Sequence, residues 1–124
     1  MMNRYKGLLV DLDGTIYFKG KFIKNSIDFL QELKQKGIVI RYLTNTTGTP
    51  PVKIVERLRG YGFDIQDEQF FNPIKVAKAY FEKNESLSYY VMASDDIKAE
   101  FEDGHWDEKK PDCVLLGALE EVCN

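Results

Sequence analysis

The chain has 124 residues, of which 44% are hydrophobic and 30% charged, and its net charge is −3 at pH 7. This length suits one small globular domain, and the acidic balance excludes the basic surface by which proteins bind nucleic acid. No apolar stretch is long enough to cross a membrane, and the N-terminus shows no secretory leader, so we expect a cytoplasmic protein without a membrane partner.

The first predicted element is a strand from Gly7 to Val10, made of small and branched apolar residues. A continuous apolar run of this kind is typical of a strand that is buried on both faces. Asp11 and Asp13 follow it directly, at the end of the strand where ligands bind in open parallel sheets. Gly14 permits a turn that can bring both carboxylates toward one ligand, and two carboxylates suit Mg²⁺ together with a phosphate.

A short flap and a helix are expected next. The segment from Thr15 to Phe22 contains Gly20 among aromatic and lysine residues, which predicts a hairpin-like flap. Asn25 or Ser26 can cap the following helix at its N-terminus, and Gly37 is well placed to end it.

The rest of the chain alternates between strand and helix patterns, which predicts a parallel sheet with crossover helices. Prolines mark the starts of two of the helices, because proline costs little in a first turn. In chain order, the predicted elements are a strand over Ile38–Leu43, a helix from Pro50-Pro51 to Gly60, a helix from Asn72-Pro73, a strand over Tyr89–Met92, a helix over Asp95–Phe101 and a strand over Cys113–Leu116. Cys113 and Cys123 lack metal-ligand spacing, so we expect buried or incidental thiols.

Two motifs carry a resemblance to a known family. The pentapeptide Asp11-Leu12-Asp13-Gly14-Thr15, after an apolar strand, resembles the first motif of the haloacid dehalogenase (HAD) superfamily of aspartate-nucleophile phosphatases. A second strand running into Thr44-Asn45 resembles the second motif. The longer string Tyr42 to Thr47 is similar to the capped subfamily IIA, which includes NagD-like and HDHD-type phosphatases. The resemblance covers only the N-terminal half of such proteins.

The resemblance implies an α/β fold. The expected architecture is a parallel, Rossmann-like core sheet with helices on both faces, plus part of an α/β cap. Residues 1–88 would form the N-terminal part of the core and residues 89–124 a partial cap. Two incomplete sheets would leave apolar faces and edges uncovered, so a homodimer is a further expectation.

The resemblance also implies a role for each motif residue. Asp11 would attack a phosphate monoester to form an aspartyl phosphate, and Asp13 would act as general acid and then general base. Asp11 and Asp13 would also contact Mg²⁺, the expected cofactor. The Thr44 hydroxyl and the backbone N–H groups near Gly14 and Asn45 would hold the phosphoryl oxygens, and the Asn45 side chain would orient the loop or Asp13. The expected substrate is a small phosphorylated metabolite or a phosphoamino acid.

Two alternatives stay open. The family's lysine and acidic metal-binding turn have no secure counterpart here, so the chain could be a noncatalytic phosphate- and Mg²⁺-binding or interaction module. Alternatively, the segment from Tyr90 to Asp96 resembles the family's last motif, and Lys75 or Lys78 would then take the place of the family's lysine. In that case the chain would be a minimal enzyme without a cap. Asp95 and Asp96 also suit the start of an ordinary helix.

Overall fold

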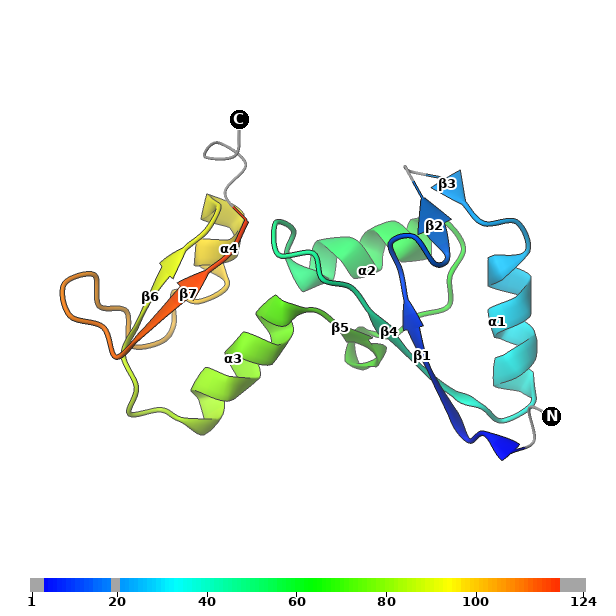
Figure 1. Ribbon diagram of the computed structural model, residues 1–124, viewed down its shortest axis with the longest axis horizontal. Coiled ribbons are helices and arrows are strands. Elements are labelled where there is room, and N and C mark those ends of the chain that lie inside the picture. Colours follow the sequence, from blue (N-terminus) through cyan, green and yellow to red (C-terminus); the bar gives the residue numbers. More distant parts are fainter. Residues whose placement is uncertain (1–3, 19–20, 119–124) are drawn as a thin grey trace. The chain divides into compact units, whose positions relative to one another are not determined.

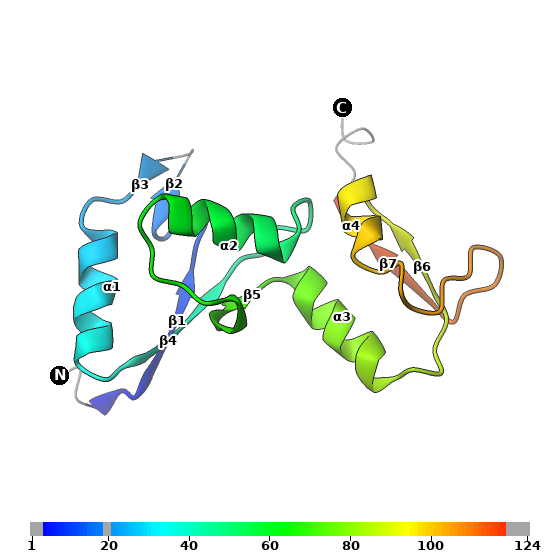
Figure 2. The same ribbon diagram turned by 180° about the vertical axis from the view of Figure 1, so that it is seen from behind.

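The computed structural model describes residues 4–18 and 21–118, which form an α/β arrangement (Figures 1 and 2). Two compact units are present, one made from Met1–Thr44 with Ile54–Phe71 and the other from Asn45–Lys53 with Asn72–Asn124. Gly20 and Cys123 lie outside the described residues. Within the described ranges, no helix combines the length and apolar character needed to cross a membrane.

The first unit is built on a three-stranded parallel sheet with the order β1–β4–β5. β1 (Gly7–Asp11) pairs along its whole length with β4 (Val39–Leu43), and β4 pairs with the two-residue strand β5 (Phe70–Phe71). The predicted parallel α/β sheet is therefore confirmed. β5 was not predicted, because two residues are too few to show an alternating pattern.

Helices α1 (Ser26–Gln35) and α2 (Pro51–Gly60) contribute to a single core on one face of this sheet. Paired residues of a parallel ladder point to the same face, so alternate residues of β1, β4 and β5 supply the strand side of this core. Figure 2 shows α2 in front of β1. The buried members of the core are Val10, Leu12, Ile16, Leu30, Leu33, Ile38, Ile40, Tyr42, Ile54, Val55, Leu58, Phe63, Ile65 and Phe70.

Side chains on the opposite face of the sheet are exposed or only partly buried. Leu9 is 69% exposed and Val39 is 52% exposed, although Val10 and Ile40 beside them are buried. The prediction that the first strand is buried on both faces is therefore wrong. The connections from β1 to β4 and from β4 to β5 move in the same direction across the sheet. Because such crossovers are right-handed, the helices in both connections lie over the same face.

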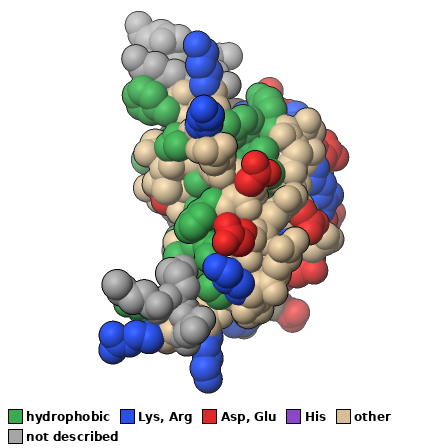
Figure 3. Space-filling model, turned by 90° about the vertical axis from the view of Figure 1, so that its right-hand side faces the viewer, with side chains coloured by type: hydrophobic (Ala, Val, Ile, Leu, Met, Phe, Trp, Pro, Cys, Tyr) green, Lys and Arg blue, Asp and Glu red, His purple; other side chains and the backbone are tan. Residues whose placement is uncertain are grey.

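Apolar side chains also reach the surface on the helices. Phe29 of α1 is 54% exposed, and Ile23 just before this helix is 46% exposed. Figure 3 views the molecule from the side on which α1 lies in Figure 1, and it shows hydrophobic side chains at the surface among acidic and basic ones. The expectation of uncovered apolar surface is thus confirmed, whereas the homodimer stays a prediction.

Most helix ends follow the predicted residues. Gly37 has a φ of 83°, in the left-handed region that glycine adopts readily after a helix. Asn25 is the N-cap residue of α1, but neither it nor Ser26 supplies a side-chain cap, and the buried Ser26 hydroxyl has no partner. The predicted capping of α1 is therefore wrong. Asn72, in contrast, accepts a hydrogen bond from the Lys75 N–H at 3.0 Å and caps the helix that starts at Pro73.

The second unit contains the parallel pair β6 (Tyr89–Met92) and β7 (Cys113–Leu116). Helices α3 (Pro73–Lys83) and α4 (Asp95–Ala99) share one core with it, and α4 ends two residues earlier than predicted. The buried members of this core are Ile74, Tyr89, Val91, Ala93, Ile97 and Phe101. The boundary between core and cap that we expect after residue 88 depends on the resemblance to the family, and it stays a prediction.

The strand pairing also bears on the minimal-enzyme alternative. That alternative requires β6 to join the sheet of β1, so that Asp95 and Asp96 complete the site at its edge. In the described chain β6 pairs with β7, in a sheet separate from β1, β4 and β5. Lys78, one of the two proposed lysines, forms an ion pair with Glu100 at 3.0 Å. The structure therefore does not support the minimal enzyme.

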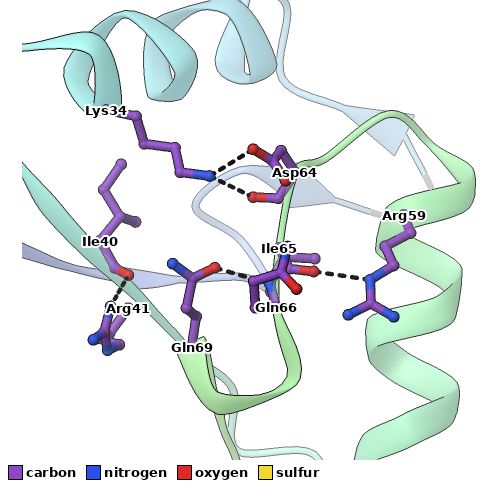
Figure 4. A network of polar contacts seen from close by, with 8 residues as sticks. All are labelled: Lys34, Ile40, Arg41, Arg59, Asp64, Ile65, Gln66 and Gln69. Carbon is purple, nitrogen blue, oxygen red and sulfur yellow. Dashed lines mark hydrogen bonds and ion pairs between the residues drawn. The ribbon is translucent and has the colours of Figure 1, made fainter.

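A polar network connects α1 and α2 to the segment between α2 and β5 (Figure 4). Lys34 Nζ donates to Asp64 Oδ2 at 2.8 Å and to the Asp64 carbonyl oxygen at 3.0 Å. Arg59 Nε donates to the Ile65 carbonyl oxygen at 2.8 Å. These contacts hold the loop in place while Ile65 stays buried in the core.

The Asp64→Asn variant should be less stable than the original chain at neutral pH, and the difference should shrink in acid. The hydrogen bond from Lys34, and then its charge, lower the pKa of Asp64 below the unfolded value of 3.8. A lowered folded-state pKa stabilises the fold above the unfolded pKa, and this contribution is lost as the pH falls through the folded-state pKa. Urea unfolding at several pH values measures this difference, and a difference that stays constant into acid would contradict the assignment.

Candidate active site

Asp11 and Asp13 lie at the carboxyl end of β1, at the edge of the first unit's sheet. Both acids are exposed, whereas Leu12 between them is only 3% exposed. The Leu12 N–H donates to the Leu43 carbonyl oxygen at 3.0 Å, which ties the end of β1 to β4. The chain therefore anchors Leu12 in the core and leaves both carboxylates accessible.

A tight turn follows these acids. Gly14 has a φ of 78°, in the left-handed region, and no atom beyond its chain neighbours lies within 4 Å of the position a Cβ would occupy. Glycine is therefore favoured here by the backbone conformation, because a side chain would meet no steric clash. The Leu12 carbonyl oxygen accepts hydrogen bonds from the N–H groups of Thr15, Ile16 and Tyr17 at 3.2, 3.1 and 3.2 Å. The Gly14 N–H donates to the Tyr17 carbonyl oxygen at 2.7 Å. The phosphate contact expected of this N–H stays a prediction, and it would require that bond to open.

Two hydroxyl groups contact the two carboxylates. Thr15 Oγ1 donates to Asp11 Oδ2 at 3.3 Å, and Thr44 Oγ1 donates to Asp13 Oδ2 at 3.3 Å. Thr44 directly follows β4 and is 6% exposed, and its N–H donates to the Phe71 carbonyl oxygen at 3.1 Å. Adjacent parallel strands thus bring Asp13 and Thr44 together although 31 positions separate them in the sequence.

The contacts differ in detail from those that the sequence suggested. Asn45 follows Thr44 and is exposed, and its predicted role in the site stays a prediction. The residue that contacts the Asp13 carboxylate in the structure is Thr44. The contact of Thr15 with Asp11 was not predicted, although a hydroxyl four positions beyond an acid in a tight turn is a usable signal for it.

The expected flap is present beyond the turn. β2 (Tyr17–Phe18) and β3 (Lys21–Phe22) form an antiparallel pair. The ring of Tyr17 lies 6.0 Å from that of Phe22, and Phe22 is packed against the first unit's core. Phe18, on the other side of the strand, is 60% exposed. The hairpin is therefore anchored through Tyr17 and Phe22, and it presents an aromatic side chain to solvent.

The donor atoms at this edge fit Mg²⁺. Asp11 and Asp13 offer exposed carboxylates, and Mg²⁺ in proteins is commonly held by one or two carboxylates together with phosphate oxygens and water. Within residues 4–18 and 21–118, no group of three His, Cys, Asp or Glu side chains could hold a metal ion. The protein ligands that these residues offer here are therefore the two acids and nearby main-chain oxygens.

Comparisons with known proteins agree with this arrangement. Residues 8–107 match the family described as haloacid dehalogenase-like hydrolase. The chain is 31% identical over 120 residues to phospholysine phosphohistidine inorganic pyrophosphate phosphatase from Danio rerio. The aligned region covers 94% of this chain and 43% of that protein. It is 28% identical over 103 residues to the 5'-nucleotidase YutF from Bacillus subtilis, and this aligned region covers 82% of this chain and 40% of YutF. The chain thus spans less than half the length of these relatives.

A solved structure shows the same fold. The 4-nitrophenylphosphatase from Thermotoga maritima superposes with a TM-score of 0.83 and 24% sequence identity, over 97% of this chain and 49% of that chain. The matched family range contains the strand ends that carry Asp11, Asp13 and Thr44. The chain therefore belongs to the haloacid dehalogenase-like hydrolases, and a solved structure described as a putative NagD protein, 26% identical with a TM-score of 0.82 over 94% of this chain, supports a place in their NagD-like branch.

Proposed function

We propose that this chain carries the nucleophile of a Mg²⁺-dependent phosphatase that acts on phosphate monoesters. The observation that best supports this proposal is the hydrogen bond from Thr44 to Asp13, two positions from Asp11 at the carboxyl edge of a parallel sheet. It brings a hydroxyl and two acids to the place where ligands bind in such sheets.

In the proposed reaction, a carboxylate oxygen of Asp11 attacks phosphorus, and the bond between phosphorus and the ester oxygen breaks. Asp13 gives its proton to the departing alkoxide. It then takes a proton from the water that attacks the aspartyl phosphate, which releases inorganic phosphate and restores Asp11. The hydrogen bond from Thr44 would orient the Asp13 carboxyl for both proton transfers.

Mg²⁺ would be held by the Asp11 carboxylate and the Asp13 main-chain carbonyl, where its charge would offset the repulsion between a carboxylate and a phosphate. We propose a small phosphorylated metabolite or a phosphoamino acid as substrate. Relatives named for phospholysine, phosphohistidine and 5'-nucleotides support this class.

A noncatalytic phosphate- and Mg²⁺-binding module is the second candidate. One observation favours it. The described residues contain no third acid grouped with Asp11 and Asp13. In such a module the same acids would bind the ion and the phosphate without turnover.

Hydrolysis of p-nitrophenyl phosphate, measured with Mg²⁺ and with EDTA, tests the proposal. We expect nitrophenolate release that requires Mg²⁺ and returns when Mg²⁺ is added back after chelation. Turnover of equal rate in EDTA would contradict the role of Mg²⁺. Saturable, Mg²⁺-dependent phosphate binding without turnover, followed by ³¹P NMR, would support the noncatalytic module, and the absence of both would contradict both candidates.

A further inference from the structure

A pocket of about 410 Å³ lies within the second unit, and the proposed phosphatase chemistry uses none of its residues. Its volume falls in the range of about 300–1,000 Å³ that is usual for small-molecule sites. Three aromatic residues, Phe81, Tyr89 and Phe101, are part of its lining, and the last two are almost fully buried. Phe81 stacks on Tyr89 with ring centroids 4.2 Å apart, and Phe101 meets Tyr89 edge-on at 5.9 Å.

Acidic side chains also line the pocket. Lys78 and Glu100 line the pocket and form an ion pair at 3.0 Å, so their charges offset each other. Glu82, Glu85 and Asp103 also line it and are exposed. In the described part of the chain, none of these three acids forms an ion pair. The pocket therefore combines a partly apolar lining with an excess of negative charge.

The walls of the pocket are held in place by hydrogen bonds. The buried Tyr89 hydroxyl donates to the Phe101 carbonyl oxygen at 2.7 Å, and the Tyr89 N–H donates to the His105 carbonyl oxygen at 2.8 Å. A Cβ at Gly104 would lie 2.6 Å from Cζ of Tyr89, so only glycine lets the loop approach the ring this closely. A pocket formed in advance spares a ligand the entropic cost of ordering it.

We propose that this pocket binds an organic cation, namely an alkylammonium group of a free polyamine or of a lysine side chain. The hydrocarbon part would lie against Phe81 and Leu87, which line the pocket and are only partly buried, and the Phe81 ring also attracts a cation through its π electrons. The ammonium group would lie among Glu82, Glu85 and Asp103. A metal ion fits less well, because Mg²⁺ and Ca²⁺ take oxygen ligands, whereas Phe81, Leu87 and Phe101 make part of this lining apolar.

Trp106 makes binding measurable, because it is the single tryptophan of the chain and its ring centroid lies 6.4 Å from that of Tyr89. Spermidine and Nα-acetyl-lysine amide are the two probes, each titrated against NaCl of equal ionic strength. Calorimetry run in parallel detects binding to which the Trp106 emission does not respond. We expect saturable binding of at least one probe. Saturation by spermidine alone would indicate a polyamine, and saturation by the lysine amide would indicate a protein side chain.

The matched variants test where the cation binds. Glu82→Gln, Glu85→Gln and Asp103→Asn should each weaken binding by about two- to fivefold, which is the usual worth of one exposed charge pair. Glu102→Gln removes the same charge from the exposed neighbour of Asp103, which does not line the pocket, and should leave binding within twofold. Circular dichroism checks that each variant is folded. The proposal is overturned by the absence of saturation with both probes, by equal effects of Glu102→Gln and Asp103→Asn, or by Mg²⁺ displacing the amine at equal ionic strength.

Discussion

Replacing Asp11 with asparagine is expected to lower the Mg²⁺-dependent hydrolysis of p-nitrophenyl phosphate by a factor on the order of 10³ or more, as removal of a catalytic nucleophile does in other enzymes. An amide has no negative charge with which to displace the leaving group, and it is a weaker Mg²⁺ ligand than a carboxylate. The fold should persist, because Asp11 is exposed and its recorded side-chain contact is the 3.3 Å hydrogen bond from Thr15. Initial rates at saturating Mg²⁺ measure the effect.

Asp28→Asn is the matched control for that experiment. Asp28 is also an exposed acid of the first unit, in the first turn of α1, so the variant has the same change in net charge. It should retain the original rate. If Asp11→Asn hydrolysed the substrate as fast as Asp28→Asn, the nucleophile would be another group, and the role proposed for Asp11 would be wrong.

The element boundaries were predicted best where a residue restricts the backbone by itself. Gly37 ends α1 with a left-handed φ of 83°, and Asn72 with Pro73 begins α3 through a side-chain cap. Burial was predicted less well, and Leu9 shows why. An apolar strand has the same sequence whether one or both of its faces are covered, because coverage depends on elements far away in the chain. The sequence of β1 therefore could not reveal that Leu9 is 69% exposed.

The candidate site shows a similar division. The motif placed Asp11, Asp13 and Thr44 at strand ends, and the observed pairing of β1 with β4 brings the last two into contact. The sequence assigned the Thr44 hydroxyl to the phosphate and Asn45 to orienting the loop or Asp13, whereas in the structure Thr44 contacts Asp13. Which of these two side chains faces Asp13 depends on the strand register, in which Asp11 lies opposite Leu43, and a shift of one residue would turn each of them to the other face.

Replacing Phe70 with alanine is expected to destabilise the fold by about 3–5 kcal/mol, the usual cost of removing a buried aromatic ring. Phe70 is fully buried and lies opposite Tyr42 in the ladder between β4 and β5. Small domains have a total stability of about 5–15 kcal/mol, so this variant should be near the limit of folding. Urea unfolding followed by far-UV circular dichroism measures the loss.

Phe71→Ala is the matched control, because it removes the same ring from the next residue of the same strand. Phe71 is only half-buried, and it points to the face of the sheet where Leu9 and Val39 are exposed. A half-buried ring keeps more contact with water in the folded chain than the fully buried ring of Phe70 does, so the cost should be below that of Phe70→Ala. An equal cost would mean that this face is covered in solution, and a fall in that cost on dilution would identify the covering element as a second copy of the chain.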